Sequence, residues 1–159
     1  MSTTAAPSVA AEPLWFLANR AVVRVASRET EGRLSIVELS GARGDMPPLH
    51  VHTRDDEAFH VLAGELSLFV GASCSVARAG DTVLAPRGIP HVYRVDSDEA
   101  RWLAIATPGG FDEFVSAVGE PAPSAGLPPA PVGADPERLS ALAAAGGIEI
   151  LGPPGTLPA

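Results

Sequence analysis

Lysine is absent from this 159-residue sequence, and all eleven of its basic residues are arginine. Its absence excludes Schiff-base chemistry and any phosphate-binding loop built around a lysine. The single cysteine, Cys74, has no second cysteine with which to form an internal disulfide bond. Long apolar runs are also missing, because prolines, glycines and charges break each one before the ~18 residues that a membrane-spanning helix needs. We therefore expect a soluble protein with no membrane partner.

Positive charge is scarce in this chain. Acidic residues outnumber basic ones by nineteen to eleven, which gives a net charge of −8 at pH 7. An acidic surface repels the phosphate backbone, and no arginine-rich stripe overcomes that repulsion locally, so nucleic acid is not an expected partner. The sequence opens Met-Ser-Thr-Thr-Ala-Ala-Pro, without the basic region and apolar core of a signal peptide. We expect a cytoplasmic location.

Short apolar runs separated by turn residues are, in contrast, abundant. With 46% hydrophobic residues, the chain can bury the core of one domain. Runs at this spacing are typical of short antiparallel strands that form a barrel or sandwich. They lie at 14–17, 21–25, 34–39, 49–52, 58–62, 66–70, 73–76, 82–85, 91–95 and 102–106. The pattern predicts an all-β fold.

The end of the chain follows a helical pattern instead. After Gly110, apolar residues recur at the spacing of a short amphipathic helix, at Phe111, Phe114, Val115 and Val118. Further on, Asp135-Pro136 is typical of an N-cap followed by proline in the first helical turn, and Gly146-Gly147 of a helix end. We expect short C-terminal helices beside the strands.

These patterns divide the chain into four segments. Residues 1–12 are small, polar and interrupted by proline, which predicts a flexible tail. Residues 13–118 hold the β-barrel and the short helix that follows it. Residues 119–134 are rich in proline and are expected to form a linker. Residues 135–159 are expected to form a helix and a tail that pack on the barrel.

Three histidines and one glutamate occur where strands could bring them together. His50 and His52 are two residues apart, so in a strand their side chains point to the same face, about 6.6 Å from each other. Arg54, Asp55 and Asp56 are expected in a solvated turn that places Glu57 at the start of a neighbouring strand, opposite the histidines. A second turn with two prolines, at 86–90, leads to His91. The histidines and Glu57 could therefore hold one metal ion.

The complete pattern runs from Gly44 through His50-Val51-His52 and Glu57 to Gly64, and from Gly80 through Pro86-Arg87-Gly88 to His91. It resembles both sequence motifs of the cupin superfamily. The resemblance covers roughly residues 32–107 and implies a single jelly-roll β-barrel, a metal held by His50, His52, Glu57 and His91, and association as a homodimer. The sequence departs from the family at Val95, where an asparagine is usual, and this change makes the pocket less polar.

Two other segments resemble small bacterial cupins related to quercetin dioxygenases. They are Thr-Pro-Gly-Gly-Phe at 107–111 and Ile-Glu-Ile-Leu-Gly-Pro-Pro at 148–154. The resemblance implies a metal-dependent dioxygenase that acts on an enolic or phenolic small molecule. Two alternatives remain open: a non-redox isomerase, cyclase or decarboxylase that uses the metal as a Lewis acid, and a small-molecule-binding protein without catalysis.

The set of donor atoms also limits which cofactor the site could hold. Three imidazoles and a carboxylate suit one divalent transition metal per chain, and iron, manganese, nickel, cobalt, copper and zinc all remain candidates. Glu57 could serve as a ligand alone or also accept a proton as a general base.

Other side chains are placed by strand parity. Tyr93 shares the face of His91, so its hydroxyl could take a catalytic part in contact with substrate, or its ring could pack in the core. Phe59 shares the face of Glu57 and, with Val95, favours an aromatic or otherwise apolar substrate. His60 lies on the opposite face and is expected at the surface or at a subunit contact.

Overall fold

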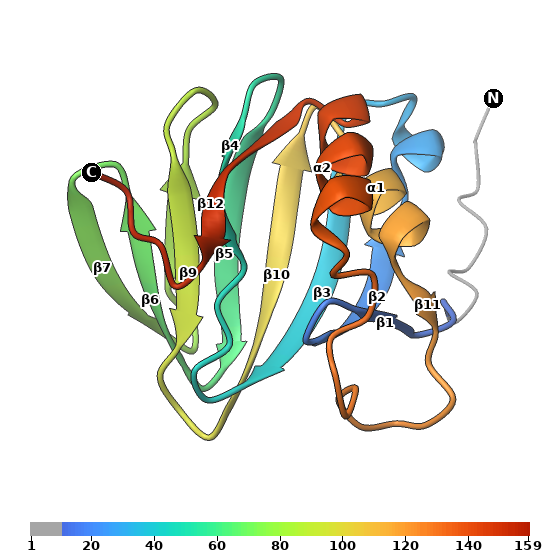
Figure 1. The fold of residues 1–159 in the computed structure, drawn as a ribbon, viewed down its shortest axis with the longest axis horizontal. Helices are drawn as coiled ribbons and strands as arrows, with labels where there is room; N and C mark the ends of the chain where they lie inside the picture. The colour runs from blue at the N-terminus through green and yellow to red at the C-terminus, as the bar shows by residue number, and fades with distance from the viewer. Residues whose placement is uncertain (1–10) are drawn as a thin grey trace, which may run out of the picture.

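The computed structural model describes residues 11–159, which form two facing antiparallel sheets with two α-helices packed at one side (Figure 1). The larger sheet has the spatial order Glu120–Pro121 (β11), Leu14–Phe16 (β1), Asn19–Val25 (β2), Ser35–Ala42 (β3), Glu99–Thr107 (β10), Asp56–Ala63 (β5) and Thr82–Ala85 (β8). The smaller sheet has the order Ile148–Pro154 (β12), Pro48–His52 (β4), His91–Val95 (β9), Glu65–Val70 (β6) and Ser73–Arg78 (β7). The helical segments are Ser27–Thr30 (η1, a 3₁₀ turn), Phe111–Val118 (α1) and Pro136–Ala145 (α2). The predicted all-β barrel with short C-terminal helices is confirmed.

The core lies between the sheets because side chains alternate along each strand. In β5, Glu57, Phe59 and Val61 are buried, whereas the residues between them are only partly covered. Strand β10 alternates in the same way and contributes Trp102, which is fully buried. Leu66 of β6 packs into this core from the opposite sheet. The inward side chains of both sheets therefore share one hydrophobic interior.

The structure explains why the cupin pattern has a glycine at position 64. It turns the chain between β5 and β6 with φ at +77°, a conformation that L-residues with a side chain adopt at a cost. A Cβ atom at this position would lie 2.4 Å from the backbone oxygen of Glu99, at the start of β10. Gly80 also has a positive φ, +94°, but a Cβ there would meet no atom of residues 11–159 within 4 Å. Gly64 is therefore required by close packing as well as by conformation.

Helices α1 and α2 lie side by side (Figure 1); α1 packs on β1 and β3 of the larger sheet, and α2 packs on α1 and on β12 of the smaller sheet. Phe111 and Phe114 of α1 pack edge-on against Phe16 of β1, with ring centroids 6.3 and 5.7 Å from that of Phe16. As predicted, α2 begins at an N-cap, because the carboxylate of Asp135 accepts a hydrogen bond from the backbone nitrogen of Arg138 at 2.8 Å. The helix pair is thereby fixed over one end of the barrel interior.

The last strand, β12, differs from the tail that the sequence predicted. It pairs with β4, so that Ile148 lies opposite His52 and Ile150 opposite His50. The sequence does not indicate this strand, because the glycine and two prolines at 152–154 are unusual in strands. The same residues coincide with irregular register at the end of β12. Of the predicted flexible tail, residues 1–10 lie outside the described residues. Neither α-helix in the described part of the chain is long and apolar enough to cross a membrane.

The outer face of the larger sheet carries an ionic cluster. Glu38 of β3 accepts hydrogen bonds from Arg24 at 2.9 Å and from Arg101 at 3.1 Å. Burial alone would raise the pKa of Glu38, but the two guanidinium groups outweigh it and hold the pKa below its usual range. His60 lies on the same sheet, facing away from Glu57 as predicted, with its Nδ1 atom 2.8 Å from the hydroxyl of Thr82.

Candidate metal centre

Three strands bring the four predicted side chains together. His50 and His52 point the same way from β4, and His91 of β9 lies directly opposite His50 in the ladder. Glu57 comes from β5, which belongs to the other sheet and faces the histidines across the barrel interior. The predicted convergence is therefore present, although β5 is not the hydrogen-bonded neighbour of β4 that the sequence suggested.

The donor atoms of these side chains converge closely. Each of the four residues offers one donor atom, and these atoms lie within 4.8 Å of one another. The Oε2 atom of Glu57 is 3.1 Å from Nε2 of His52 and 3.0 Å from Nε2 of His91. Two donors at right angles about one metal, each bonded at ~2.1 Å, lie ~3.0 Å apart. The spacing of the carboxylate and the imidazoles matches that value.

The orientation of each imidazole is fixed by its outer nitrogen. Nδ1 of His50 lies 2.8 Å from the carbonyl oxygen of Pro48, and Nδ1 of His91 lies 3.1 Å from that of Ile89. Because a carbonyl oxygen only accepts hydrogen bonds, Nδ1 carries the proton and Nε2 presents its lone pair to the centre. Such outer contacts are typical of histidines that bind metals.

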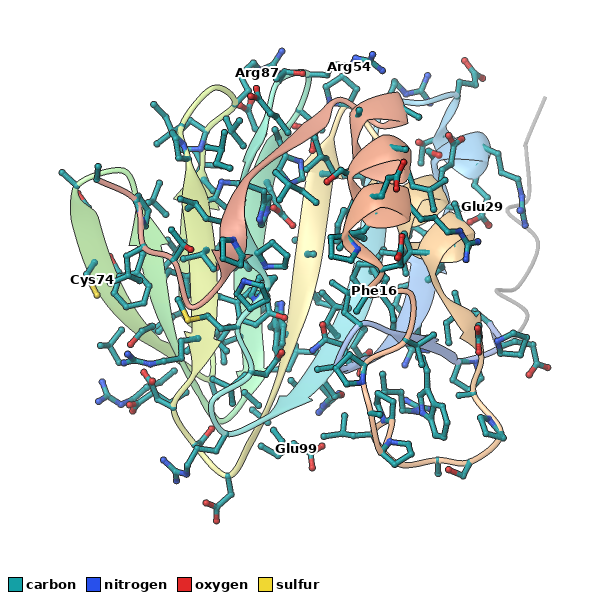
Figure 2. All side chains as sticks on the ribbon, viewed as in Figure 1. Phe16, Glu29, Arg54, Cys74, Arg87 and Glu99 are labelled. Atoms are coloured by element: carbon teal, nitrogen blue, oxygen red, sulfur yellow. The ribbon has the colours of Figure 1, made fainter. Side chains whose placement is uncertain are left out.

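Asp55 holds the third imidazole, contrary to the predicted solvated turn. Its carboxylate accepts a hydrogen bond from Nδ1 of His52 at 2.8 Å, and the residue is only 7% exposed. The prediction is correct for Arg54, which is exposed and lies at the same end of the barrel as Arg87 (Figure 2). A polar run between strands is typical of a turn, and the sequence carries no signal that one of its carboxylates folds back on His52.

The cluster requires a positive charge at its centre. Lone pairs and a carboxylate repel one another unless a cation or a proton lies between them. Burial by itself would lower the pKa of His52, but the charge of Glu57 and the hydrogen bond to Asp55 raise it to about 10. Burial likewise would raise the pKa of Glu57, but the charge of His52, together with the contact from His91, holds it well below its usual range.

His50 behaves differently from its neighbour. Burial lowers the pKa of His50 to about 3, and the charges of His91 and His52 act in the same direction. The ring therefore stays neutral and keeps its lone pair available. Nε2 of His52 is buried and has no hydrogen-bond partner within residues 11–159, although Glu57 is close. The unpartnered nitrogen of His52 and the neutral ring of His50 fit a metal ion, and three nitrogens with one oxygen suit a divalent transition metal.

An apolar cavity of about 60 Å³ adjoins the cluster. His50, Glu57 and Phe59 line it from the barrel, and Phe111 and Leu139 line it from the two helices. A larger outer groove of about 660 Å³ lies next to it and is formed largely by the chain around 44–48 and by β12. Several residues line both spaces: Leu17, Asn19, Pro47, Pro48, Tyr93, Leu139 and Ile150. The inner cavity therefore adjoins the metal cluster on one side and the groove on the other.

Tyr93 lies where the cavity meets the groove. Its ring is buried against Trp102 and Phe59, and its hydroxyl lies 3.0 Å from Oδ1 of Asn19 and 2.9 Å from Oδ2 of Asp45. The ring packs in the core, as one interpretation of Tyr93 predicted, and the residue lines the cavity wall; a catalytic part for its hydroxyl stays a prediction. Asn19 and Asp45 belong to no motif, and nothing in the sequence indicates that they meet Tyr93.

Other predicted positions fall into the core or the surface. Phe59 lines the cavity, as the apolar-pocket prediction requires. Val95, at the position where the cupin pattern usually has asparagine, is buried in the hydrophobic core. Cys74 is exposed on the edge strand β7 (Figure 2).

Comparison with known proteins agrees with the motifs. Residues 39–106 match the cupin domain family Cupin_2. The chain is 36% identical over 109 residues to quercetin 2,3-dioxygenase of Bacillus subtilis (strain 168), an alignment that covers 69% of this chain and 32% of that enzyme. The chain thus spans about a third of the length of that relative.

Solved structures show the same fold at low sequence identity. A variant of oxalate decarboxylase from Bacillus subtilis superposes with a TM-score of 0.61 at 19% identity, over 72% of this chain and 33% of that one. KdgF from Halomonas sp. gives 0.55 at 18% identity, over 60% of this chain and 84% of that one. The motifs, the two facing sheets and these matches together show that this chain belongs to the cupin superfamily.

Proposed function

We propose that this protein is a metal-dependent dioxygenase that acts on an enolic or phenolic small molecule. The observation that carries the proposal is the buried cluster of His50, His52, His91 and Glu57 beside an apolar cavity. The similarity to quercetin 2,3-dioxygenase supports the reaction class. Because that similarity spans a third of the relative, the activity and the substrate are inferred for this chain from its own site.

The four side chains would hold one divalent transition metal, which would supply a Lewis-acidic, redox-active centre with coordination positions that the protein leaves open. Phe59, Phe111 and Leu139 keep the adjoining space apolar and exclude water from it. His50 is the least buried of the four side chains and borders the cavity, so substrate would approach the cluster on its side.

Glu57 is proposed as a ligand in the first place. Its carboxylate lies between two imidazoles, and its lowered pKa makes it a weak proton acceptor at neutral pH. A role for Glu57 as general base would require it to move away from the histidines toward the substrate. The arrangement of donors therefore favours Glu57 as an ionised ligand that stays between the histidines.

The test begins with metal content. Purified wild-type protein is expected to contain nearly one transition-metal ion per chain, and the double variant His50→Ala/His52→Ala is expected to contain almost none. His60→Ala is the matched control, because that histidine faces away from the cluster on the same barrel. Oxygen uptake by the metal-loaded protein is then measured with quercetin.

The outcomes separate the three functional classes. Metal-dependent oxygen uptake that the double variant lacks and His60→Ala retains would support a dioxygenase. Stoichiometric metal without oxygen uptake would refute a dioxygenase that cleaves quercetin and would shift the weight to Lewis-acid chemistry on the same scaffold or to another substrate. Absence of metal after reconstitution would refute the metal centre itself and leave a small-molecule-binding barrel.

A further inference from the structure

The size of the two adjoining spaces places the body of a substrate outside the inner cavity. About 60 Å³ holds a few water molecules, each of which occupies ~30 Å³ in the liquid. The outer groove, at about 660 Å³, is within the range of ~300–1,000 Å³ that binds small molecules. A substrate would therefore lie mainly in the groove and extend only its reactive end toward the metal cluster. The reactive end must pass the residues that line both spaces, and the body of the substrate lies beside them.

Two of those shared residues, Asn19 and Tyr93, are polar, and Asp45 of the groove joins them. Asn19 is 2% exposed and Tyr93 6% exposed, in surroundings that are otherwise apolar. The ring of Phe59 contacts both Tyr93 and His91, with centroid distances of 6.3 and 5.9 Å. About one aromatic ring thus separates this polar group from the metal cluster.

The three side chains contain too few hydrogen-bond donors for their acceptors. The amide nitrogen of Asn19 donates to Oδ2 of Asp45 at 2.6 Å and to the carbonyl oxygen of Ser40 at 3.3 Å, which uses both of its hydrogens. The opposite amide orientation would set its oxygen against those two acceptors. The single hydroxyl hydrogen of Tyr93 then faces two acceptors, Oδ1 of Asn19 and Oδ2 of Asp45. When the hydroxyl donates to the carboxylate of Asp45, Oδ1 of Asn19 is left without a donor among residues 11–159.

Asp45 is also a partly buried carboxylate that has no basic side chain among its hydrogen-bond partners within residues 11–159. Its partners are neutral groups: the amide of Asn19, the hydroxyl of Tyr93 and the backbone of Met46. Burial raises its pKa, and these hydrogen bonds offset that rise only in part. An additional donor from a ligand in the groove would satisfy the carboxylate group without a change in the protein.

We propose that Asn19, Asp45 and Tyr93 form a polar subsite where the cavity meets the groove, and that it binds an O–H or N–H donor on an otherwise apolar substrate. The inference rests on the proposed function, because it assumes that the reactive end of the same molecule reaches the metal cluster. It narrows the substrate class to apolar compounds with a second polar substituent, about one ring away from the oxygen that approaches the metal.

A pair of related ligands tests the subsite. Quercetin carries hydroxyl groups beyond the one next to its ketone, whereas 3-hydroxyflavone has only that one. Binding of each is measured without oxygen, by titration of the metal-loaded protein and the change in ligand absorbance. Wild type is expected to bind quercetin at least about tenfold more tightly, because a hydrogen bond to a charged acceptor is worth that factor or more.

Two variants change the preference in different directions. Asp45→Asn keeps the shape and supplies a further donor within the protein, so it is expected to weaken quercetin binding by about tenfold and to leave 3-hydroxyflavone binding within about twofold of wild type. Tyr93→Phe keeps the ring but removes the hydroxyl that competes for the acceptors, so it is expected to bind quercetin at least as tightly as wild type does. The matched control is Asp98→Asn, since that carboxylate is exposed and pairs with Arg43 at the surface.

A second measurement does not depend on any ligand. If the subsite lacks a donor, Asp45→Asn should leave the melting temperature of the free protein unchanged or raise it. A lower melting temperature, or loss of bound metal in this variant, would instead assign Asp45 a structural role and overturn the proposal.

The ligand titrations distinguish failure of the subsite from failure of the proposed function. Equal binding of the two flavones by wild type, or an unchanged preference in Asp45→Asn, would overturn the subsite and leave the metal-dependent activity standing. Binding of neither flavone by metal-loaded wild type would overturn the proposed substrate class and the subsite together.

Discussion

Replacing Asp55 with asparagine is expected to weaken metal binding by about ten- to a hundredfold, or ~1.4–2.7 kcal/mol. The carboxylate of Asp55 is buried and lies 2.8 Å from Nδ1 of His52, whereas the outer nitrogens of His50 and His91 contact neutral carbonyl oxygens. Asp55 therefore supplies the one negative charge behind the three imidazoles. Its removal weakens one donor of four, so a partial loss is expected.

The asparagine can also present its amide nitrogen to Nδ1 of His52. The ring proton would then move to Nε2, the atom that faces the centre, and that ring could no longer bind a metal. This second effect places the expected loss toward the upper end of the range. Asp55→Ala, which leaves Nδ1 without a partner but imposes no tautomer, is expected to lose less affinity than Asp55→Asn.

The assay is competition for Co²⁺ or Mn²⁺ between the protein and a chelator of known affinity. Asp56→Asn is the matched control, because Asp56 is the next residue and pairs with Arg87 away from the histidines. Wild type and Asp56→Asn are expected to bind within about twofold of each other. Equal metal affinity in Asp55→Asn and Asp56→Asn would refute the reasoning that the contact with His52 tunes the centre.

Unfolding and metal measurements test three other features. Glu38→Gln is expected to lower the free energy of unfolding by about 1 kcal/mol at neutral pH. The pKa of Glu38 in the folded protein lies below its ordinary value of 4.5. The difference in unfolding free energy between the variant and wild type should therefore be complete above pH 4.5 and vanish as the pH falls through the folded pKa. A difference that persists in acid would contradict the ionic explanation. Gly64→Ala is expected to cost more than about 3 kcal/mol in urea unfolding, against about 1–2 for Gly80→Ala, and equal costs would exclude the backbone contact as the cause. Deletion from Ile148 onward should lower both the urea midpoint and the metal stoichiometry, whereas unchanged stoichiometry would show that β4 holds its histidines without β12.

The fold and the four converging side chains could be predicted because their signals are local. Alternation within each short run indicates a strand, and the two-residue spacing of His50 and His52 fixes a shared face whatever the rest of the chain does. The ten strands expected from apolar runs are all present, with ends that differ by a few residues.

The contacts that the sequence did not indicate depend on tertiary structure. Asn19 and Tyr93 are 74 residues apart and meet only because β2 and β9 face each other across the barrel. Asp55 lies in a polar run whose composition is that of an exposed turn, and only the fold shows that it bends toward His52. Strand β12 is stabilised by its partner β4 rather than by its own propensity, since glycine and proline disfavour strands.

The pairing of β12 with β4 also bears on the order in which the protein is made. A ribosome synthesises His50 about 100 residues before Ile150, its neighbour in the ladder. Until the later segment emerges, one edge of β4 exposes unpaired backbone groups beside two histidines, and such edges invite pairing with other chains. Contacts this distant in sequence also form slowly, because a long loop must close first. A nascent or truncated chain would therefore carry the metal-binding residues well before it could hold them in place, and this interval is when a chaperone would matter most.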